Sequence, residues 1–110
     1  MLLSGVFGNV TAEKALLSVV NYGSSYPRRI AATFGISVSQ VQRQLERLER
    51  EAVLSSRLVG RTRVYELNPR YLFRDELEAL LRKALRHLPA TVIEEYFTQR
   101  GRPRRRGKAL

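Results

Sequence analysis

The sequence predicts one mainly α-helical domain that carries a β-hairpin. Apolar residues recur at helical spacing through most of the chain, and one β-rich stretch is interrupted by a Gly-Arg pair. The 110 residues suffice for a single hydrophobic core, and their apolar share of 44% is ordinary for a folded protein. The expected architecture is a three-helix core, the hairpin, and further helices after it.

Two helices are expected before residue 36. Thr11 is the predicted N-cap of the first, and Glu13 suits the positive end of the helix dipole. The first helix should stop at residues 21–25, which we expect to form a loop. The second is short, because Pro27 stands at a first helical position and Gly35 ends the segment after about two turns.

The strongest helix signal covers Ser37–Ala52. Ser37 and Gln40 form an S-x-x-Q capping box, and apolar residues then follow at helical spacing. The opposite face is polar and has no acidic residue before Glu46. Its side chains near the start of the helix are Ser39, Gln40, Gln42 and Arg43, with Arg47 one turn later.

A β-hairpin follows this helix. Residues 53–59 and 62–67 are rich in strand formers, and Gly60-Arg61 between them suits a two-residue type II′ turn. Arg57, Arg61 and Arg63 are expected to cluster at the tip of the hairpin.

Two more helices are expected after the hairpin. Residues 73–88 carry a wide apolar face that ends at Pro89, and Thr91 with Glu94 predicts a capping box for a short last helix. The predicted organisation is therefore a domain over residues 1–88, a short accessory helix over 89–99 and a basic tail over 100–110.

Charge separates the tail from the rest of the chain. The protein has 20 Lys and Arg residues against 10 acidic ones, a formal net charge of +10. Residues 100–110 contribute six of these cations and no acid, so residues 1–99 hold 14 basic (20 − 6) and 10 acidic side chains. Both parts are basic, which favours a nucleic acid or another anionic surface as partner.

Several classes of protein are disfavoured by composition. The chain has no cysteine and one histidine, so disulfides, thiolate metal sites and cofactor binding are not expected. A nucleophile with a neighbouring base and a Gly-rich phosphate loop are also missing, and we expect no enzymatic activity. No apolar run has the length of a membrane span, and we expect a cytoplasmic protein that does not bind membranes.

The order of these elements is that of a winged helix-turn-helix. The stretch "RRIAATFGISVSQVQRQLERLEREAVLSSRLVGRTRVYELNP" resembles the core of ArsR-type winged-helix transcriptional regulators. It is most similar to a small variant that accompanies nucleotidyltransferase-like proteins, over roughly residues 7 to 86. The resemblance implies a homodimer that binds double-stranded DNA with Ser37–Ala52 as recognition helix. It does not extend to the metal sites of that family, which need Cys or His clusters.

The residues themselves also indicate DNA contact. Gln pairs well with adenine and Arg with guanine in the major groove, and cations at a helix start or on a wing suit phosphates or the minor groove. The expected DNA-binding residues of the folded part are Arg28, Arg29, Ser37, Ser39, Gln40, Gln42, Arg43, Arg47, Arg57, Arg61 and Arg63.

The tail contains a motif of its own. The segment Arg100-Gly101-Arg102-Pro103-Arg104 resembles the AT-hook, which implies contact with the minor groove of A·T-rich DNA. A polybasic end that only neutralises phosphates is the alternative, and it too binds DNA. Under either interpretation the tail residues expected to bind DNA are Arg100, Arg102, Arg104, Arg105 and Arg106.

Two other functions fit the same sequence. The winged domain and the final helices can serve as an interaction module that docks onto a nucleotidyltransferase-like protein. Alternatively, the protein binds nucleic acid with little sequence preference, as a chromatin-type or RNA-binding protein. A salt-dependent affinity for duplex DNA separates nucleic-acid binding from the docking module.

Overall fold

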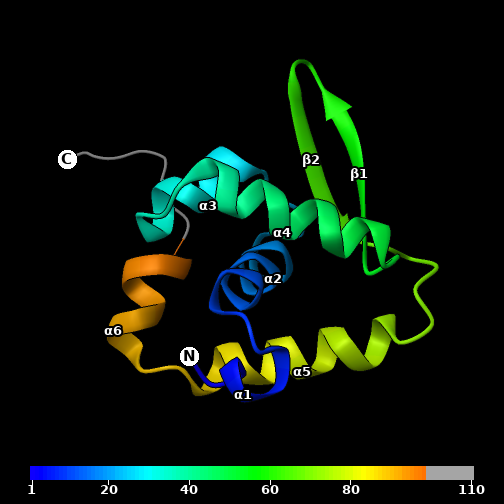
Figure 1. The fold of residues 1–110 in the computed structure, drawn as a ribbon. Coiled ribbons are helices and arrows are strands. Elements are labelled where there is room, and N and C mark those ends of the chain that lie inside the picture. Colours follow the sequence, from blue (N-terminus) through cyan, green and yellow to red (C-terminus); the bar gives the residue numbers. More distant parts are fainter. Residues whose placement is uncertain (99–110) are drawn as a thin grey trace.

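The computed structural model describes residues 1–98, so the predicted basic tail lies outside the described residues. The fold is mainly α-helical with one antiparallel hairpin, as predicted (Figure 1). In chain order the elements are α1 (Ser4–Phe7), α2 (Val10–Tyr22), α3 (Pro27–Phe34), α4 (Val38–Arg50), β1 (Leu54–Val59), β2 (Thr62–Leu67), α5 (Arg74–His87), α6 (Ala90–Val92) and the π-helical turn η1 (Ile93–Phe97).

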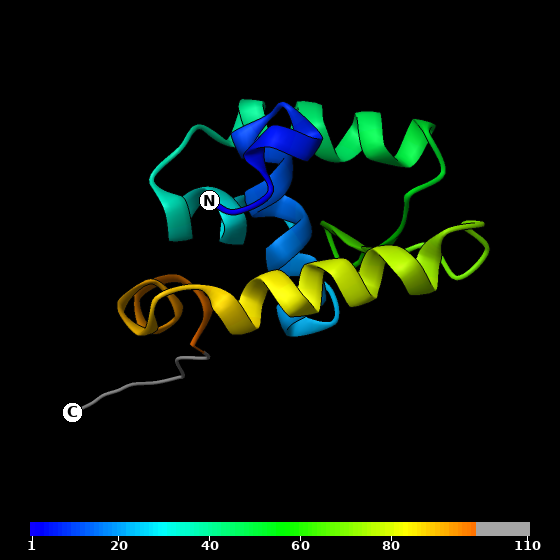
Figure 2. The same ribbon diagram turned by 90° about the horizontal axis from the view of Figure 1, so that it is seen from below.

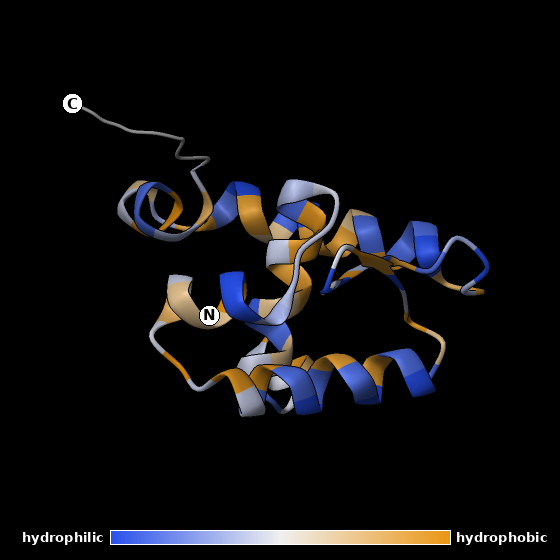
Figure 3. Ribbon diagram, turned by 90° about the horizontal axis from the view of Figure 1, so that it is seen from above, coloured by the Kyte–Doolittle hydropathy of each residue, from blue (hydrophilic) through white to orange (hydrophobic). Residues whose placement is uncertain are grey.

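Helix α2 is the centre of the molecule. It lies between α4 on one side and α5 on the other, as Figures 1 and 2 both show. Leu17 of α2, Leu45 of α4 and Leu81 of α5 are completely buried in the resulting core. In Figure 3 the hydrophobic segments of the helices turn toward this core, and the hydrophilic ones follow their outer edges. Burial of these apolar stripes orients α4, so that its polar face is turned outward.

Local signals correctly predicted the turn between α3 and α4. Pro27 begins α3, and Gly35 ends it in the left-handed conformation with φ 66°. Ser37 is the N-cap of α4, where its Oγ accepts a hydrogen bond from the Gln40 N–H at 3.1 Å. A left-handed glycine followed by a capped helix fixes the angle between α3 and α4.

Two predicted caps are wrong. Asn9, not Thr11, is the N-cap of α2, because its Oδ1 accepts a hydrogen bond from the Ala12 N–H at 2.9 Å. The helix therefore begins one residue before Thr11. The capping box of Thr91 and Glu94 is also wrong, since the last helix begins at Ala90 directly after Pro89 and has no side-chain cap.

The hairpin has the predicted two-residue turn. Val59 pairs with Thr62, Gly60 has φ 63°, and Arg61 is not among the described residues with positive φ. A positive φ at the first central residue alone corresponds to type II′. At the base of the hairpin, Ser25 exchanges two backbone hydrogen bonds with Tyr65, at 2.8 and 3.0 Å. Ser25, in the predicted loop at residues 21–25, therefore forms an isolated antiparallel β-bridge to the two-stranded hairpin.

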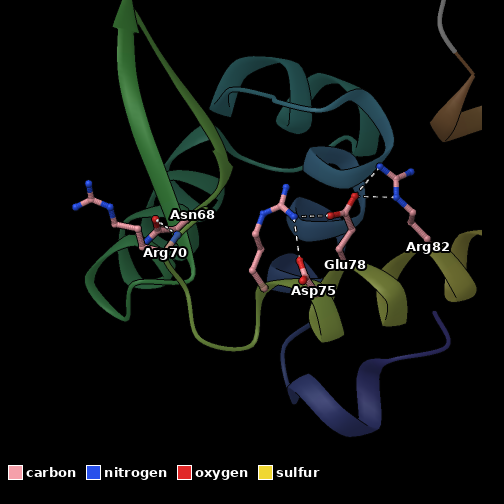
Figure 4. Close-up of polar contacts among 6 residues, drawn as sticks. Asn68, Arg70, Asp75, Glu78 and Arg82 are labelled. Atoms are coloured by element: carbon pink, nitrogen blue, oxygen red, sulfur yellow. Dashed lines mark hydrogen bonds and ion pairs between the residues drawn. The ribbon is translucent and has the colours of Figure 1, made fainter.

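A polar turn leads from β2 into α5. The Asn68 side chain donates to Ala52 O and accepts from the Arg70 N–H, at 3.0 Å each. Within α5, the Glu78 carboxylate lies between two arginines, 3.1 Å from Arg74 and 2.9 Å from Arg82 (Figure 4). The Asn68 bonds fix the turn after the hairpin, and the Glu78 pairs stabilise α5 in the i, i+4 arrangement.

Candidate nucleic-acid interface

An open groove of about 250 Å³ separates the helix-turn-helix from the tip of the hairpin. The start of α3, the first turns of α4 and the hairpin turn form its walls. Of residues 1–98, three arginines and no acidic residue line it, so the groove is suited to a polyanion. The described residues that line it are Tyr26, Pro27, Arg28, Val38, Gln42, Arg61, Thr62 and Arg63.

The outward face of α4 adjoins this groove. Ser39, Gln40 and Arg43 are exposed, and the N-cap residue Ser37 is exposed beside them. Gln42 is also exposed but is turned toward the hairpin, where it lines the groove. Because successive residues of an α-helix are turned by about 100°, these side chains cover the front and both flanks of α4.

The two predicted arginines of α3 lie in different places. Arg28 is exposed and lines the groove. Arg29 is half-buried, and its guanidinium carbon lies 3.7 Å from the centre of the Tyr22 ring, in a cation–π arrangement. Arg29 therefore faces the other flank of α3 and packs against the fold.

The hairpin arginines do not form one cluster. In the strand register, Arg57 is opposite Val64 and Arg63 is opposite Leu58, which places the two arginines on different faces of the hairpin. Arg57 pairs with Glu66 at 3.3 Å on the face away from the groove. Arg61, in the turn, and Arg63 line the groove.

Arg47 lies outside the groove as well. Its guanidinium donates two hydrogen bonds to the Gln44 side chain, at 3.0 and 3.1 Å. It lines a hollow together with Val6 and Phe7 of the α1 segment. The structure thus brings Arg28, Gln42, Arg61 and Arg63 together around one groove, with Ser37, Ser39, Gln40 and Arg43 on the adjoining face of α4. It separates Arg29, Arg47 and Arg57 from them.

A hydrogen-bonded chain between α4 and the hairpin was not predicted from the sequence. The Ser56 hydroxyl donates to the Glu49 carboxylate at 2.7 Å and accepts from Arg63 Nη1 at 3.0 Å. Burial, together with the carboxylates of Glu49 and Glu46, raises the pKa of the adjacent Tyr65. The two-residue turn could have predicted these contacts from the sequence. It sets the strand register, which puts Ser56, Arg63 and Tyr65 on one face of the hairpin.

The five predicted tail contacts, Arg100, Arg102, Arg104, Arg105 and Arg106, lie outside the described residues. Among the helices of residues 1–98, none has both the length and the apolarity that a membrane crossing requires.

Comparison with solved structures supports the architecture. The AntR antimony-specific transcriptional repressor has a TM-score of 0.60 and 23% identity, covering 86% of this chain and 76% of that one. YusO from Bacillus subtilis has a TM-score of 0.56 and 20% identity, with coverage of 78% and 67%. A MarR-family transcriptional regulator from Rhodococcus sp. RHA1 has a TM-score of 0.52 and 19% identity, with coverage of 84% and 82%.

The fold is a winged helix-turn-helix. In this winged helix, α3 and α4 are the helix-turn-helix, and the β1–β2 hairpin is the wing. At these identities the similarity concerns the fold and does not select the ArsR type, since one neighbour is a MarR-family protein. No protein-family model matches the chain, and a search of curated proteins found no match.

Proposed function

We propose that this protein binds double-stranded DNA sequence-specifically and regulates transcription. One observation carries the proposal: the arginine-lined groove adjoins an exposed polar helix face on a winged helix. A B-DNA major groove is wide enough for an α-helix, and the wing and helix starts can then reach the phosphates on either side. The similar solved structures named as transcriptional repressors or regulators agree with this assignment.

In this proposal the residues have different roles. Gln40, Gln42 and Arg43 of α4 read base edges, because amide and guanidinium side chains can each make two hydrogen bonds to a purine. Arg28, Arg61 and Arg63 hold the phosphates beside the groove. Arg29, Arg47 and Arg57 are bound within the fold or lie on other faces, and we give them a secondary, supporting role at the edges of the DNA site.

We also propose that the basic tail adds phosphate contacts and that the protein acts as a homodimer. One recognition helix and one wing read few base pairs, and two copies double the length of DNA that is read. The surface formed by the N-terminus and α5 has exposed apolar side chains, among them Leu2 at 56% and Leu80 at 38% exposure. In Figure 1, α2 lies between α5 and α4, so pairing through the α5 side of this surface leaves the DNA site open.

The test is DNA selection from a random duplex pool, followed by binding measurements on alanine variants. Replacing Gln40 or Arg43 should reduce discrimination among duplexes by about 1–3 kcal/mol, because a base contact is lost. Replacing Arg61 should weaken binding to all duplexes and reduce the log–log salt slope by about 0.9.

The matched control is Arg86→Ala, which removes the same charge from an exposed position on α5. It should leave both the discrimination and the salt slope nearly unchanged. Equal losses on every duplex for Gln40 and Arg43 would indicate binding without sequence preference. A protein that ignores duplex DNA in dilute buffer would contradict the proposal and favour the docking module.

A further inference from the structure

The end of the last helical segment is fixed to α2. The Asn21 side chain donates a hydrogen bond to Phe97 O at 2.7 Å. The Thr98 hydroxyl donates to Ile93 O at 3.1 Å, across the π-helical turn. Carbonyls at the end of a helix have no backbone donor within it, so the Asn21 side chain satisfies a Phe97 carbonyl that would otherwise need water.

Aromatic contacts hold the same segment against α3. The Phe97 side chain is buried, with its ring centre 5.7 Å from that of Phe34, and the Tyr96 ring stacks on Phe34 at 4.9 Å. The Tyr22 hydroxyl also donates to Tyr96 O at 3.4 Å. We call this set, Asn21, Tyr22, Phe34, Tyr96 and Phe97, the clasp. It holds Thr98, the last described residue, in a defined place.

The clasp and the arginine-lined groove lie on two flanks of α3. Thr98 lines a hollow together with Arg29, Ala32 and Thr33, whereas Arg28 lines the groove. An α-helix with its side chains is about 10–12 Å wide, so Thr98 lies roughly one helix width from the groove. Figure 1 shows the same arrangement, with the end of the α6–η1 segment beside α3 and the wing beyond α4.

A strongly cationic sequence follows this fixed point. Between Thr98 and Arg106 there are five arginines and no acidic residue. These eight residues can span at most about 28 Å, which exceeds the width of α3. The cations can therefore reach a duplex seated on the groove, and they start from the flank of α3 that is remote from the wing.

We propose that the clasp directs the basic tail onto the duplex that flanks the bound site on the α3 side, opposite the side contacted by the wing. This inference rests on the proposed function. Because the clasp fixes the start of the tail, the tail meets the flanking phosphates intramolecularly, at an effective concentration of the order of millimolar. Wing and tail then extend the contact with DNA in opposite directions from α4.

Site-directed cleavage of bound DNA tests this placement. The chain has no cysteine, so a single introduced cysteine can carry an iron-chelate probe at one chosen position. The probes are placed at Gly107→Cys in the tail and at Val59→Cys beside the wing turn, an exposed position that does not line the groove. Each probe is used in the full chain bound to an end-labelled selected duplex. We expect a compact set of cuts from each probe, at separate positions flanking the contacts of α4.

A third protein carries the Gly107→Cys probe and an insertion of roughly eight Gly and Ser residues after Thr98. The insertion lengthens the tether without altering the clasp or the folded domain. We expect the tail cuts to spread over more base pairs and the compact set to weaken about 2-fold or more, because effective concentration falls as the tether lengthens. The wing cuts of a matched Val59→Cys protein with the same insertion should stay in place.

The outcomes separate this inference from the proposed function. If the wing probe cuts and the tail probe does not, or if both cut the same positions, the inference is wrong although DNA binding stands. Tail cuts that are identical with and without the insertion would also overturn it, because the fixed start would then not matter. If none of the proteins binds the duplex, the proposed function itself fails.

Discussion

Glu13 is a fully buried carboxylate with a structural task. Its two oxygens accept hydrogen bonds from the Leu3 N–H at 2.8 Å and from the Ser4 hydroxyl at 2.9 Å. Both donors belong to the start of α1, so a side chain of α2 caps the preceding helix. The sequence suggested only that Glu13 complements the dipole of its own helix, because the folding back of α1 cannot be seen from local spacing.

We expect Glu13→Ala to lower the free energy of unfolding by about 2–3 kcal/mol, since it leaves a buried N–H without an acceptor. Glu13→Gln keeps one oxygen for Leu3, and the Ser4 hydroxyl can rotate to accept from the new amide. Glu13→Gln should therefore lower the free energy of unfolding by less than about 1 kcal/mol. Chemical denaturation of the three proteins measures both values, and equal losses would contradict the assigned hydrogen bonds.

At the scale of elements, a series of side-chain hydrogen bonds connects the wing to α4. Ser56 connects the Glu49 carboxylate of α4 to Arg63 of the wing. Ser55, the preceding residue, is on the opposite face of the hairpin, where it pairs with Glu66 in the strand register. The two serines lie in the same strand but on opposite faces, so Ser55 is a matched control for Ser56.

Ser56→Ala should lower the free energy of unfolding by about 1.5–3 kcal/mol, because both of its hydrogen bonds involve charged partners. Ser55→Ala should change it by less than about 0.5 kcal/mol. We also expect faster hydrogen exchange of the wing amides in the Ser56 variant, since the wing loses this side-chain connection to α4. If the two variants behave alike in denaturation and exchange, the Glu49–Ser56–Arg63 hydrogen bonds do not hold the wing.

At the scale of the whole molecule, the polar groove and the apolar surface are on different sides of α2. Leu2, Leu3, Leu80 and Ala84 line one hollow between the N-terminus and α5. We infer that a second copy covers it, in line with the proposed homodimer. A symmetric pair formed there would leave both α4 faces free.

Leu80→Glu should therefore convert the protein to a monomer at low micromolar concentration, because a charge would be buried in the paired surface. Ala79→Glu, which adds the same charge at an exposed position outside the hollow, should leave the dimer intact. Sedimentation measures both. A wild-type protein that sediments as a monomer, free and on DNA, would contradict the dimer.

Much of the architecture follows from short-range signals. Ser37 before a helical pattern, Gly35 after a short helix and Gly60-Arg61 between strand formers each act within a few residues. The structure confirms all three. The failed caps at Thr11 and Thr91 came from competing signals in the same turn, Asn9 in the first case and Pro89 in the second.

Which arginines can act together was decided by tertiary structure. Arg28 and Arg29 are adjacent in sequence, but a helix turns them to different flanks, and the Tyr22 ring then holds Arg29. The strand register separates Arg57 from Arg63 in the same way. The amino-acid composition cannot distinguish these arginines, although Arg28 and Arg63 border the groove and Arg29 and Arg57 do not.

The sequence by itself therefore determined helices α2 to α5, the wing and the excess of positive charge, because caps, turns and composition act locally or additively. Only the tertiary structure decided where Glu13 is buried, which side chains line the groove and where the clasp places the start of the tail. Each of those depends on residues far apart in the chain that meet when α2, α4 and α5 bury their apolar faces together.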